Sequence, residues 1–231
     1  FFRRMQGGLP YVRLKTAASL DGRTAMQSGE SKWITGTEAR RDVQKLRAQS
    51  GAMITGIGTV LADDPSLTVR PEEWLDWHYA EPVQPLRVIL DSQLRTPLNA
   101  KILQQTGVVI VSQHAITHPH ALALQALGAE IWSFAPPSHL GEGREWILQQ
   151  VLQKLAERGV NEVLVEAGAT LAGAFIQANL VDELIVYLAP TLLGSEARPM
   201  FELPFTQMAQ QQRLNITDMR RVGGDIRLTL N

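Results

Sequence analysis

Short runs of β-branched and aliphatic residues alternate along the chain with segments whose apolar residues recur at helical spacing. Three of these runs are Ala52–Ile57, Gly107–Ser112 and Glu162–Glu166, and glycine, proline or polar residues lie close to their ends. This alternation is typical of βαβ units, in which helices connect neighbouring parallel strands. It predicts an α/β fold with a mainly parallel central sheet flanked by helices.

The same patterns give approximate boundaries for the elements. The predicted strands are Tyr11–Thr16, Ala52–Ile57, Leu86–Asp91, Gly107–Ser112, Ala129–Phe134, Glu162–Glu166 and Glu183–Ala189. The predicted helices are one that ends near Gly51, then Pro119–Leu127, Arg144–Arg158, and one that ends near Asn179. Thr35 and Glu38 have the spacing of a capping box at the start of the first helix. Leu214–Arg221 and Ile226–Leu230 flank a glycine pair and predict a C-terminal antiparallel hairpin.

The composition is that of an ordinary globular protein. Of the 231 residues, 45% are hydrophobic, which is enough apolar material for one domain with a large core. The 22 Lys and Arg residues nearly balance the 23 Asp and Glu residues, so no charge excess indicates nucleic acid or an anionic membrane as a partner. No apolar run approaches the ~20 residues that cross a bilayer. The chain has no cysteine, which excludes disulfides, thiolate catalysis and cysteine-ligated zinc.

Two glycine turns follow predicted strands. Gly56-Ile57-Gly58-Thr59 lacks the sixth-position glycine of a Rossmann fingerprint, because Leu61 stands there. Gly168–Gly173 has the glycine spacing of a P-loop without the Lys-Ser/Thr that must follow it. Each turn still leaves backbone N–H groups near a helix start, which suits a phosphate or pyrophosphate. The alternative is a pair of tight turns with no ligand.

Lys15 and Glu166 are the most suggestive ionisable residues. Lys15 lies in an apolar strand in which Val12 and Leu14 face the core, so its side chain points the other way, towards solvent or a cleft. Glu166 ends a buried strand just before a glycine turn, where ligands gather in α/β sheets. An exposed lysine and a structural capping carboxylate are the alternatives.

The basic and aromatic residues leave similar alternatives open. Arg47 and Arg70 are candidates for binding an anionic substrate, although solvated surface arginines are more common. Trp33 is either a packing anchor or a lid over a flat ring. His118 and His120 flank a proline and have no third ligand nearby, so we predict a helix start and no metal site there.

Several longer motifs occur in a fixed order. They are Lys15–Arg23 (KTAASLDGR), Gly29–Thr35 (GESKWIT), Gly58–Pro65 (GTVLADDP), Val165–Leu171 (VEAGATL), Leu180–Glu183 (LVDE) and Leu192–Gly194 (LLG), with Arg47 between the second and the third. In this order they closely resemble the reductase domain of the bifunctional riboflavin-biosynthesis deaminase/reductase, from about Leu9 to the end of the chain. The family usually has Glu-Gly-Gly where this chain has Glu166-Ala167-Gly168, and residues 71–143 match only loosely.

The resemblance implies a dihydrofolate-reductase-like fold that binds NADPH without a Rossmann motif. It also implies that the protein is located in the cytoplasm. It implies NADPH-dependent reduction of the ribosyl group of 5-amino-6-(5-phosphoribosylamino)uracil to the ribityl group. The residues it places at the substrate are Ser31, Thr35, Arg47, Leu67 and Arg70, with Lys15 and Glu166 as catalytic residues near the reacting sugar and base. The residues it places at the cofactor are Ala17, Trp33, Thr59, Asp63, Gly168, Ala169, Thr170 and Leu171.

The resemblance also implies partners. The family's other half is a zinc deaminase, which needs Cys and His ligands. Because this chain has no cysteine, we expect that domain upstream of Phe1, with residues 1–8 as the remnant of a linker and residues 9–231 as a single reductase domain. The family commonly pairs through its sheet edge and C-terminal strands. The apolar run Ile226–Leu230 therefore predicts a homodimer.

Two alternative functions remain from the sequence. A reductase of another pterin-like substrate would share the fold but would need no phosphate-binding arginines. A noncatalytic nucleotide-binding module would keep the glycine turns but has no reason to combine Lys15 and Glu166 with two arginines.

Overall fold

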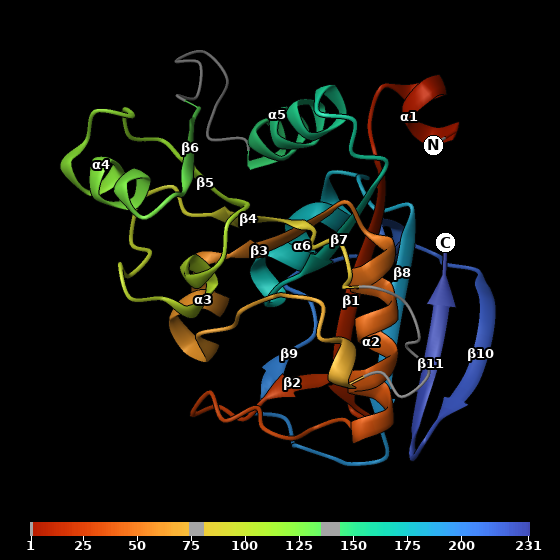
Figure 1. The fold of residues 1–231 in the computed structure, drawn as a ribbon. Coiled ribbons are helices and arrows are strands. Elements are labelled where there is room, and N and C mark those ends of the chain that lie inside the picture. Colours follow the sequence, from red (N-terminus) through yellow and green to blue (C-terminus); the bar gives the residue numbers. More distant parts are fainter. Residues whose placement is uncertain (1, 74–80, 135–143) are drawn as a thin grey trace.

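A computed structural model describes residues 2–73, 81–134 and 144–231. Within these residues the centre is a nine-stranded sheet in the order β10-β11-β8-β1-β7-β3-β4-β5-β6 (Figure 1). Its strands are β1 (Tyr11–Ser19), β3 (Ala52–Gly56), β4 (Leu86–Leu90), β5 (Val108–Ser112), β6 (Glu130–Ser133), β7 (Glu162–Glu166), β8 (Glu183–Ala189), β10 (Ile216–Val222) and β11 (Asp225–Leu230). All pairs from β8 to β6 are parallel, and β11 and β10 are added at one edge by antiparallel pairing.

Helices cover both faces of this sheet. They are α2 (Thr37–Gln49), α3 (Ile57–Asp63), α4 (Pro119–Ala126), α5 (Arg144–Glu157) and α6 (Ala169–Gln177), whereas the short α1 (Phe2–Gly7) buries no residue. Apolar residues of α2, α3 and α4 belong to one buried cluster, and those of α5 and α6 belong to the other. The 3-10 helices in the described residues are η1 (Pro71–Glu73), η2 (Lys101–Gln104) and η3 (Met208–Gln210). None of the described helices combines the length and apolar character that a membrane span requires.

Strand β7 shows why the sequence builds a sheet that is covered on both faces. Val163 and Val165 pack into the cluster beneath α5 and α6, whereas Leu164 packs into the cluster beneath α2. All three are fully buried, since successive side chains of a strand point to opposite faces. A strand buried on both faces needs a continuous apolar run, which is the pattern that the sequence shows.

The predicted fold class is confirmed, including the parallel sheet and the C-terminal hairpin. Strands β7 and β8 have the predicted boundaries, and the other predicted strands and helices are present within a few residues. The sequence patterns miss α3, because they assign Ile57 to the preceding strand and Gly58 to a turn. They also missed the short pair of β2 (Arg23–Ala25) and β9 (Arg198–Pro199), whose few residues carry no periodic pattern.

The predicted capping box at Thr35 and Glu38 is wrong. The N-cap of α2 is Gly36, and it makes no side-chain capping hydrogen bond. Instead, the Gly36 N–H donates to the carboxylate of Asp225 at 2.7 Å, and Asp225 lies at the start of β11. A carboxylate at this end of a helix interacts favourably with the helix dipole. A partner 189 residues away therefore replaces the local cap.

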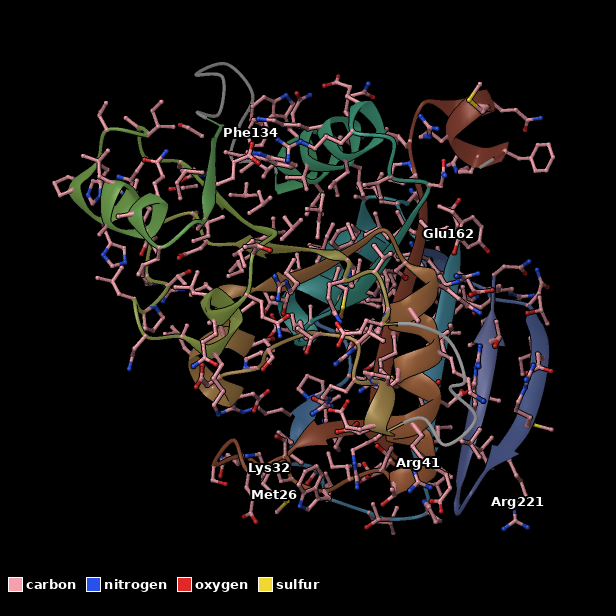
Figure 2. All side chains as sticks on the ribbon, viewed as in Figure 1. Met26, Lys32, Arg41, Phe134, Glu162 and Arg221 are labelled. Carbon is pink, nitrogen blue, oxygen red and sulfur yellow. The ribbon has the colours of Figure 1, made fainter. Side chains whose placement is uncertain are left out.

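The hairpin β10–β11 forms the edge of the sheet next to α2 (Figure 1). Gly223 in its turn has a φ of +62°, a conformation that favours glycine. Beside the turn, the Arg221 side chain points away from the sheet (Figure 2). Two apolar side chains of β10, Ile216 and Met219, are 60% and 68% exposed. The outer strand thus presents apolar surface at an edge.

Candidate active site

The site is built where β1 and β7 run side by side. The register of this parallel pair sets Lys15 opposite Glu166, so both side chains point to the face covered by α2. The ammonium nitrogen of Lys15 lies 3.8 Å from Oε2 of Glu166. The two candidate catalytic residues, 151 positions apart by their numbers, are therefore neighbours in the fold.

Arg47 joins them from the last turn of α2. Its Nε donates to Oε1 of Glu166 at 2.8 Å, and a terminal nitrogen donates to Oε2 at 3.1 Å. This is the bidentate geometry in which a guanidinium binds a carboxylate most strongly. The other terminal nitrogen donates to the backbone carbonyl of Thr68 at 3.1 Å. Three of the five N–H donors of Arg47 are thus used within the protein.

The environment of these three charges shifts their pKa values. Burial alone would raise the pKa of Glu166, but the positive charges of Arg47 and Lys15 outweigh it and lower this pKa to about 2. Burial lowers the pKa of Lys15; Glu166 opposes that shift and Arg47 adds to it. The cluster carries two positive charges and one negative charge. Each side chain keeps 12–16% of its surface exposed, which leaves the cluster accessible to a ligand.

The segment before η1 reaches the cluster through an unusual backbone. Leu67 has a φ of +51°, a left-handed conformation that costs a residue with a side chain roughly 1–2 kcal/mol. Its side chain is buried among apolar residues beneath α2. The neighbouring Thr68 carbonyl accepts from Arg47. Such strain is concentrated at functional sites in proteins, which favours a role for this segment.

Arg70 lies in a different setting from Arg47. Its guanidinium is 3.0 Å from the carboxylate of Glu73, and 45% of its side chain is exposed. Its backbone N–H donates to the side-chain oxygen of Gln44, whose amide group in turn donates to Glu73. The charge of Arg70 also contributes to the low pKa of Glu166. Arg70 therefore lies at the rim of the cluster with its guanidinium partly in solvent.

The two glycine turns lie against each other beside this cluster. Gly56 ends β3, which is hydrogen-bonded to β7, and a Cβ at Gly56 would lie 3.4 Å from the side chain of Leu171. Gly168 is the N-cap of α6 and makes no side-chain capping bond. A Cβ there would meet nothing within 4 Å, so a ligand can approach this backbone closely. On α3, Thr59 and Asp63 are partly or fully exposed.

The remaining predicted residues lie in the loop before α2 and on β1. Ser31, Trp33 and Thr35 belong to this loop, and the ring of Trp33 is 72% exposed. The guanidinium of Arg40 lies 4.4 Å from the centre of that ring and also donates to the Thr35 carbonyl. Ala17 lies two residues after Lys15 on the same face of β1. The roles assigned to these residues remain predictions.

Comparison with known proteins identifies the family. The family model described as the RibD C-terminal domain matches residues 10–228. This chain belongs to the RibD C-terminal domain family. The riboflavin biosynthesis protein RibD of Escherichia coli is 44% identical to it, over 100% of this chain and 62% of that protein. The RibD of Haemophilus influenzae is also 44% identical, over 99% of this chain and 60% of that protein.

A solved structure confirms the predicted dihydrofolate-reductase-like fold. Acinetobacter baumannii RibD (form 2) has a TM-score of 0.85 and 46% identity, over 100% of this chain and 60% of that one. The chain thus spans about 60% of the length of the RibD proteins it matches. A Thermotoga maritima protein described as a diaminohydroxyphosphoribosylaminopyrimidine deaminase/5-amino-6-(5-phosphoribosylamino)uracil reductase has a TM-score of 0.79. Its identity is 24%, over 100% of this chain and 58% of that one, which shows the fold alone.

Sequence reasoning missed a second polar network in this RibD C-terminal domain. The hydroxyl of Tyr187 on β8 donates to the carboxylate of Asp42 on α2, and Arg227 on β11 donates to the same oxygen. The sequence patterns place Tyr187 in a predicted strand and assign no role to Asp42 or Arg227. No local signal connects the three, because they lie on separate elements.

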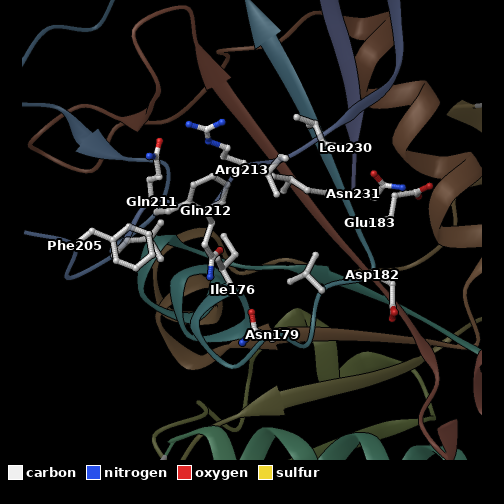
Figure 3. Close-up of a pocket in the computed structure, with 15 residues that line it drawn as sticks. Ile176, Asn179, Asp182, Glu183, Phe205, Gln211, Gln212, Arg213, Leu230 and Asn231 are labelled. Atoms are coloured by element: carbon white, nitrogen blue, oxygen red, sulfur yellow. The ribbon is translucent and has the colours of Figure 1, made fainter. Parts of the chain in front are cut away.

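A separate pocket of about 630 Å³ lies between α6, the start of β8 and the C-terminal residues (Figure 3). Ile176, Phe205 and Leu230 give it an apolar wall. None of the residues predicted for the substrate or the cofactor is among the residues that line it. Among the described residues, no group of three or more His, Asp or Glu side chains has the arrangement of a metal site.

Proposed function

We propose that this chain reduces 5-amino-6-(5-phosphoribosylamino)uracil to 5-amino-6-(5-phosphoribitylamino)uracil with NADPH as the donor. The observation that carries the proposal is the buried cluster of Lys15, Glu166 and Arg47 beside two adjoining glycine turns, in a member of the RibD C-terminal domain family. The description of the Thermotoga maritima protein names this substrate for a protein of the same fold. This chain spans only about 60% of the length of its RibD relatives, so we propose this activity for the chain and do not transfer it from them.

The residues present fit a dinucleotide. The first-turn N–H groups of α6 have no acceptor within the helix, and Gly168 leaves open space in front of them. We assign residues 168–171 to the pyrophosphate, and Thr59 and Asp63 would be further contacts of the cofactor. Trp33 and Ala17 complete the cofactor contacts. When bound, NADPH supplies the hydride that the anomeric carbon of the substrate accepts.

Lys15 is the proposed proton donor. The bond between the anomeric carbon and the ring oxygen breaks as the sugar opens, and the ring oxygen takes a proton from the Lys15 ammonium. The opened sugar then carries a C=N bond that is reduced to the amine, so that one proton and one hydride are added in total. The lowered pKa of Lys15 brings this acid closer to neutral pH, where proton transfer is most effective.

Glu166 and the arginines position the substrate. Glu166 remains ionised at neutral pH and accepts hydrogen bonds from the pyrimidine edge. Two N–H donors of Arg47 remain after its three protein contacts, and the half-exposed guanidinium of Arg70 is available at the rim. We assign the substrate phosphate to these two arginines, with Ser31, Thr35 and Leu67 lining the same side.

The direct test follows NADPH absorbance with the purified chain. Oxidation is expected when the phosphoribosylaminouracil is added, and none is expected without it. Dihydrofolate and dihydropterin serve as parallel substrates. If they are reduced and the phosphoribosylaminouracil is not, the chain is the alternative pterin-like reductase. Binding of NADPH with no turnover of any of these would indicate a noncatalytic module. The resemblance predicts a higher kcat/KM with NADPH than with NADH; equal values would contradict that preference.

The partner assignments are further proposals. We propose that residues 1–8 join residues 9–231, the reductase domain, to an upstream zinc deaminase domain; this agrees with the 60–62% coverage of the RibD relatives. This chain alone is then expected to release no ammonia from the deaminase substrate. The run Ile226–Leu230 is not the edge that the sequence predicted, because it lies on β11, which is paired on both sides by β10 and β8. A homodimer is proposed instead through the outer strand β10, whose Ile216 and Met219 are exposed, and a sedimentation measurement that finds only a ~25 kDa species at micromolar concentration would contradict it. A cytoplasmic location remains a proposal from the family resemblance.

A further inference from the structure

Tyr187 lies beneath the proposed proton donor. It is fully buried on β8, and the register of β8 with β1 sets it opposite Ala17. Its side chain therefore points to the same face of the sheet as that of Lys15. The ammonium nitrogen of Lys15 lies 5.9 Å from the centre of the Tyr187 ring, within reach of a cation–π interaction.

Two further residues fix the position of this ring. The Tyr187 hydroxyl donates to Oδ2 of Asp42 at 2.7 Å, and a terminal nitrogen of Arg227 donates to the same oxygen at 2.9 Å. Burial and the hydrogen bond to Asp42 raise the pKa of Tyr187, so the phenol stays protonated and keeps donating. The ring is therefore held from α2 and from β11.

The charged and aromatic groups that face Lys15 come from three elements. Glu166 faces it from β7, Arg47 from α2 and Tyr187 from β8. The 3.8 Å separation from Glu166 is too long for a hydrogen bond, and no described residue accepts one from Lys15. The carboxylate of Glu166 is instead occupied by Arg47. The ammonium is therefore stabilised without a hydrogen bond, by the charge of Glu166 at 3.8 Å and by the Tyr187 ring.

We propose that Tyr187 is a positioning residue whose ring face stabilises and places the Lys15 ammonium for proton donation, with Asp42 and Arg227 holding the ring. This inference rests on the proposed function for its chemical meaning. An aromatic face stabilises a cation electrostatically without occupying its N–H donors as a carboxylate does. Lys15 therefore stays charged while its donors remain free for the substrate oxygen.

The test reads Lys15 directly. The chain has five lysines, so the 13C signal of the Lys15 ε-carbon can be assigned by comparison with Lys15→Arg and titrated by NMR. In Tyr187→Met the Lys15 pKa is expected to fall by about half a unit or more, because the ammonium loses its aromatic partner. In Tyr187→Phe the ring remains, and most of the pKa is expected to be retained. An unchanged or raised pKa in Tyr187→Met overturns the proposal.

Tyr11→Met is the matched control. The Tyr11 ring also faces a cation, since the Arg13 guanidinium lies 5.4 Å from its centre at the start of β1. Its loss is expected to leave the Lys15 titration unchanged. If Tyr187→Met and Tyr11→Met shift the Lys15 pKa equally, the shift comes from a general loosening of the sheet and the proposal is wrong.

A second series keeps the test decisive if Tyr187→Met does not fold. Phenylalanine, 3-fluorophenylalanine and 3,5-difluorophenylalanine placed at position 187 weaken the ring's attraction for a cation with little change in shape. The Lys15 pKa is expected to fall stepwise along this series, and a flat series overturns the proposal. Both NMR tests are independent of turnover, so they hold even if the chain fails to reduce the proposed substrate. Where turnover is found, the basic limb of the kcat–pH profile is expected to move with the Lys15 pKa while KM stays nearly constant.

Discussion

The two arginines assigned to the substrate phosphate lie in contrasting parts of the molecule. Arg47 lies in the last turn of α2 with its guanidinium bound to Glu166 and to the Thr68 carbonyl, and only 12% of its side chain is exposed. Arg70 lies just before η1, its side chain is 45% exposed, and it pairs with Glu73 three residues later. Arg47 belongs to a buried cluster in which three of its five N–H donors are already used, and Arg70 belongs to a partly solvated rim.

This difference separates two roles of arginine, a structural role in a buried ion pair and a binding role at the surface. A buried guanidinium that loses its carboxylate leaves an uncompensated charge, so Arg47 is part of the structure as well as of the site. A solvated pair such as Arg70–Glu73 contributes little to stability and exchanges its partner readily. We therefore expect the buried cluster to govern stability and kcat and to supply one phosphate contact, Arg47, whereas the rim acts on phosphate binding alone.

The largest expected effect is that of Arg47→Ala. Removing one partner of a buried ion pair costs about 3–5 kcal/mol, because Glu166 keeps its charge without its main partner. Chemical unfolding of this variant measures the loss. Arg220→Ala, which breaks the exposed pair with Asp218, is the control and should leave stability unchanged. Equal stability of the two variants would contradict the distinction between a buried and an exposed ion pair.

Lys15→Gln tests the chemical role of the same cluster. Loss of a general acid typically lowers kcat by about 10²- to 10⁴-fold, and KM for the phosphorylated substrate should change much less. Lys154→Gln on α5, on the other face of the sheet, is the control and should retain wild-type kinetics. A variant that raises KM but keeps kcat would show that Lys15 binds substrate without donating the proton.

The pH dependence of stability tests the pKa of Glu166. This pKa falls from its ordinary value of 4.5 to about 2 in the folded chain. A carboxylate with a lowered folded pKa stabilises the fold above its unfolded pKa, and that contribution is lost as the pH falls through the folded value. The stability difference between wild type and Glu166→Gln should therefore be full above about pH 5 and shrink towards pH 2. A difference that does not change with pH would contradict the ion pairing.

The smallest expected effect is that of Glu73→Gln at the rim. The substitution removes the charge that now faces Arg70, and exposed pairs of this kind are worth about 0.2–1 kcal/mol. The guanidinium becomes more available to the phosphate, so KM should fall by roughly two- to fivefold with little change in kcat. An increase in KM would show that Glu73 holds Arg70 in its binding position.

The sequence predicted the parts of the fold that depend on local patterns. Apolar runs such as Val163-Leu164-Val165 identified the parallel strands, and the order of the motifs identified the family. The pairing of Arg47 with Glu166 was not predicted, because it depends on how α2 packs on β7 across 119 residues. The same limit applies to Asp225, which caps α2 in place of the predicted box.

The most direct measurement of the phosphate assignment compares Arg70→Ala on two substrates, the phosphorylated pyrimidine and its dephosphorylated form. Loss of a charge-assisted contact with the phosphate should lower kcat/KM for the phosphorylated substrate by about ten- to a hundredfold and leave the value for the other nearly unchanged. Glu166→Gln should lower kcat/KM for both by similar factors, because its contacts are with the reacting end. If Arg70→Ala lowers both values equally, Arg70 does not bind the phosphate and the division between the buried cluster and the rim is wrong.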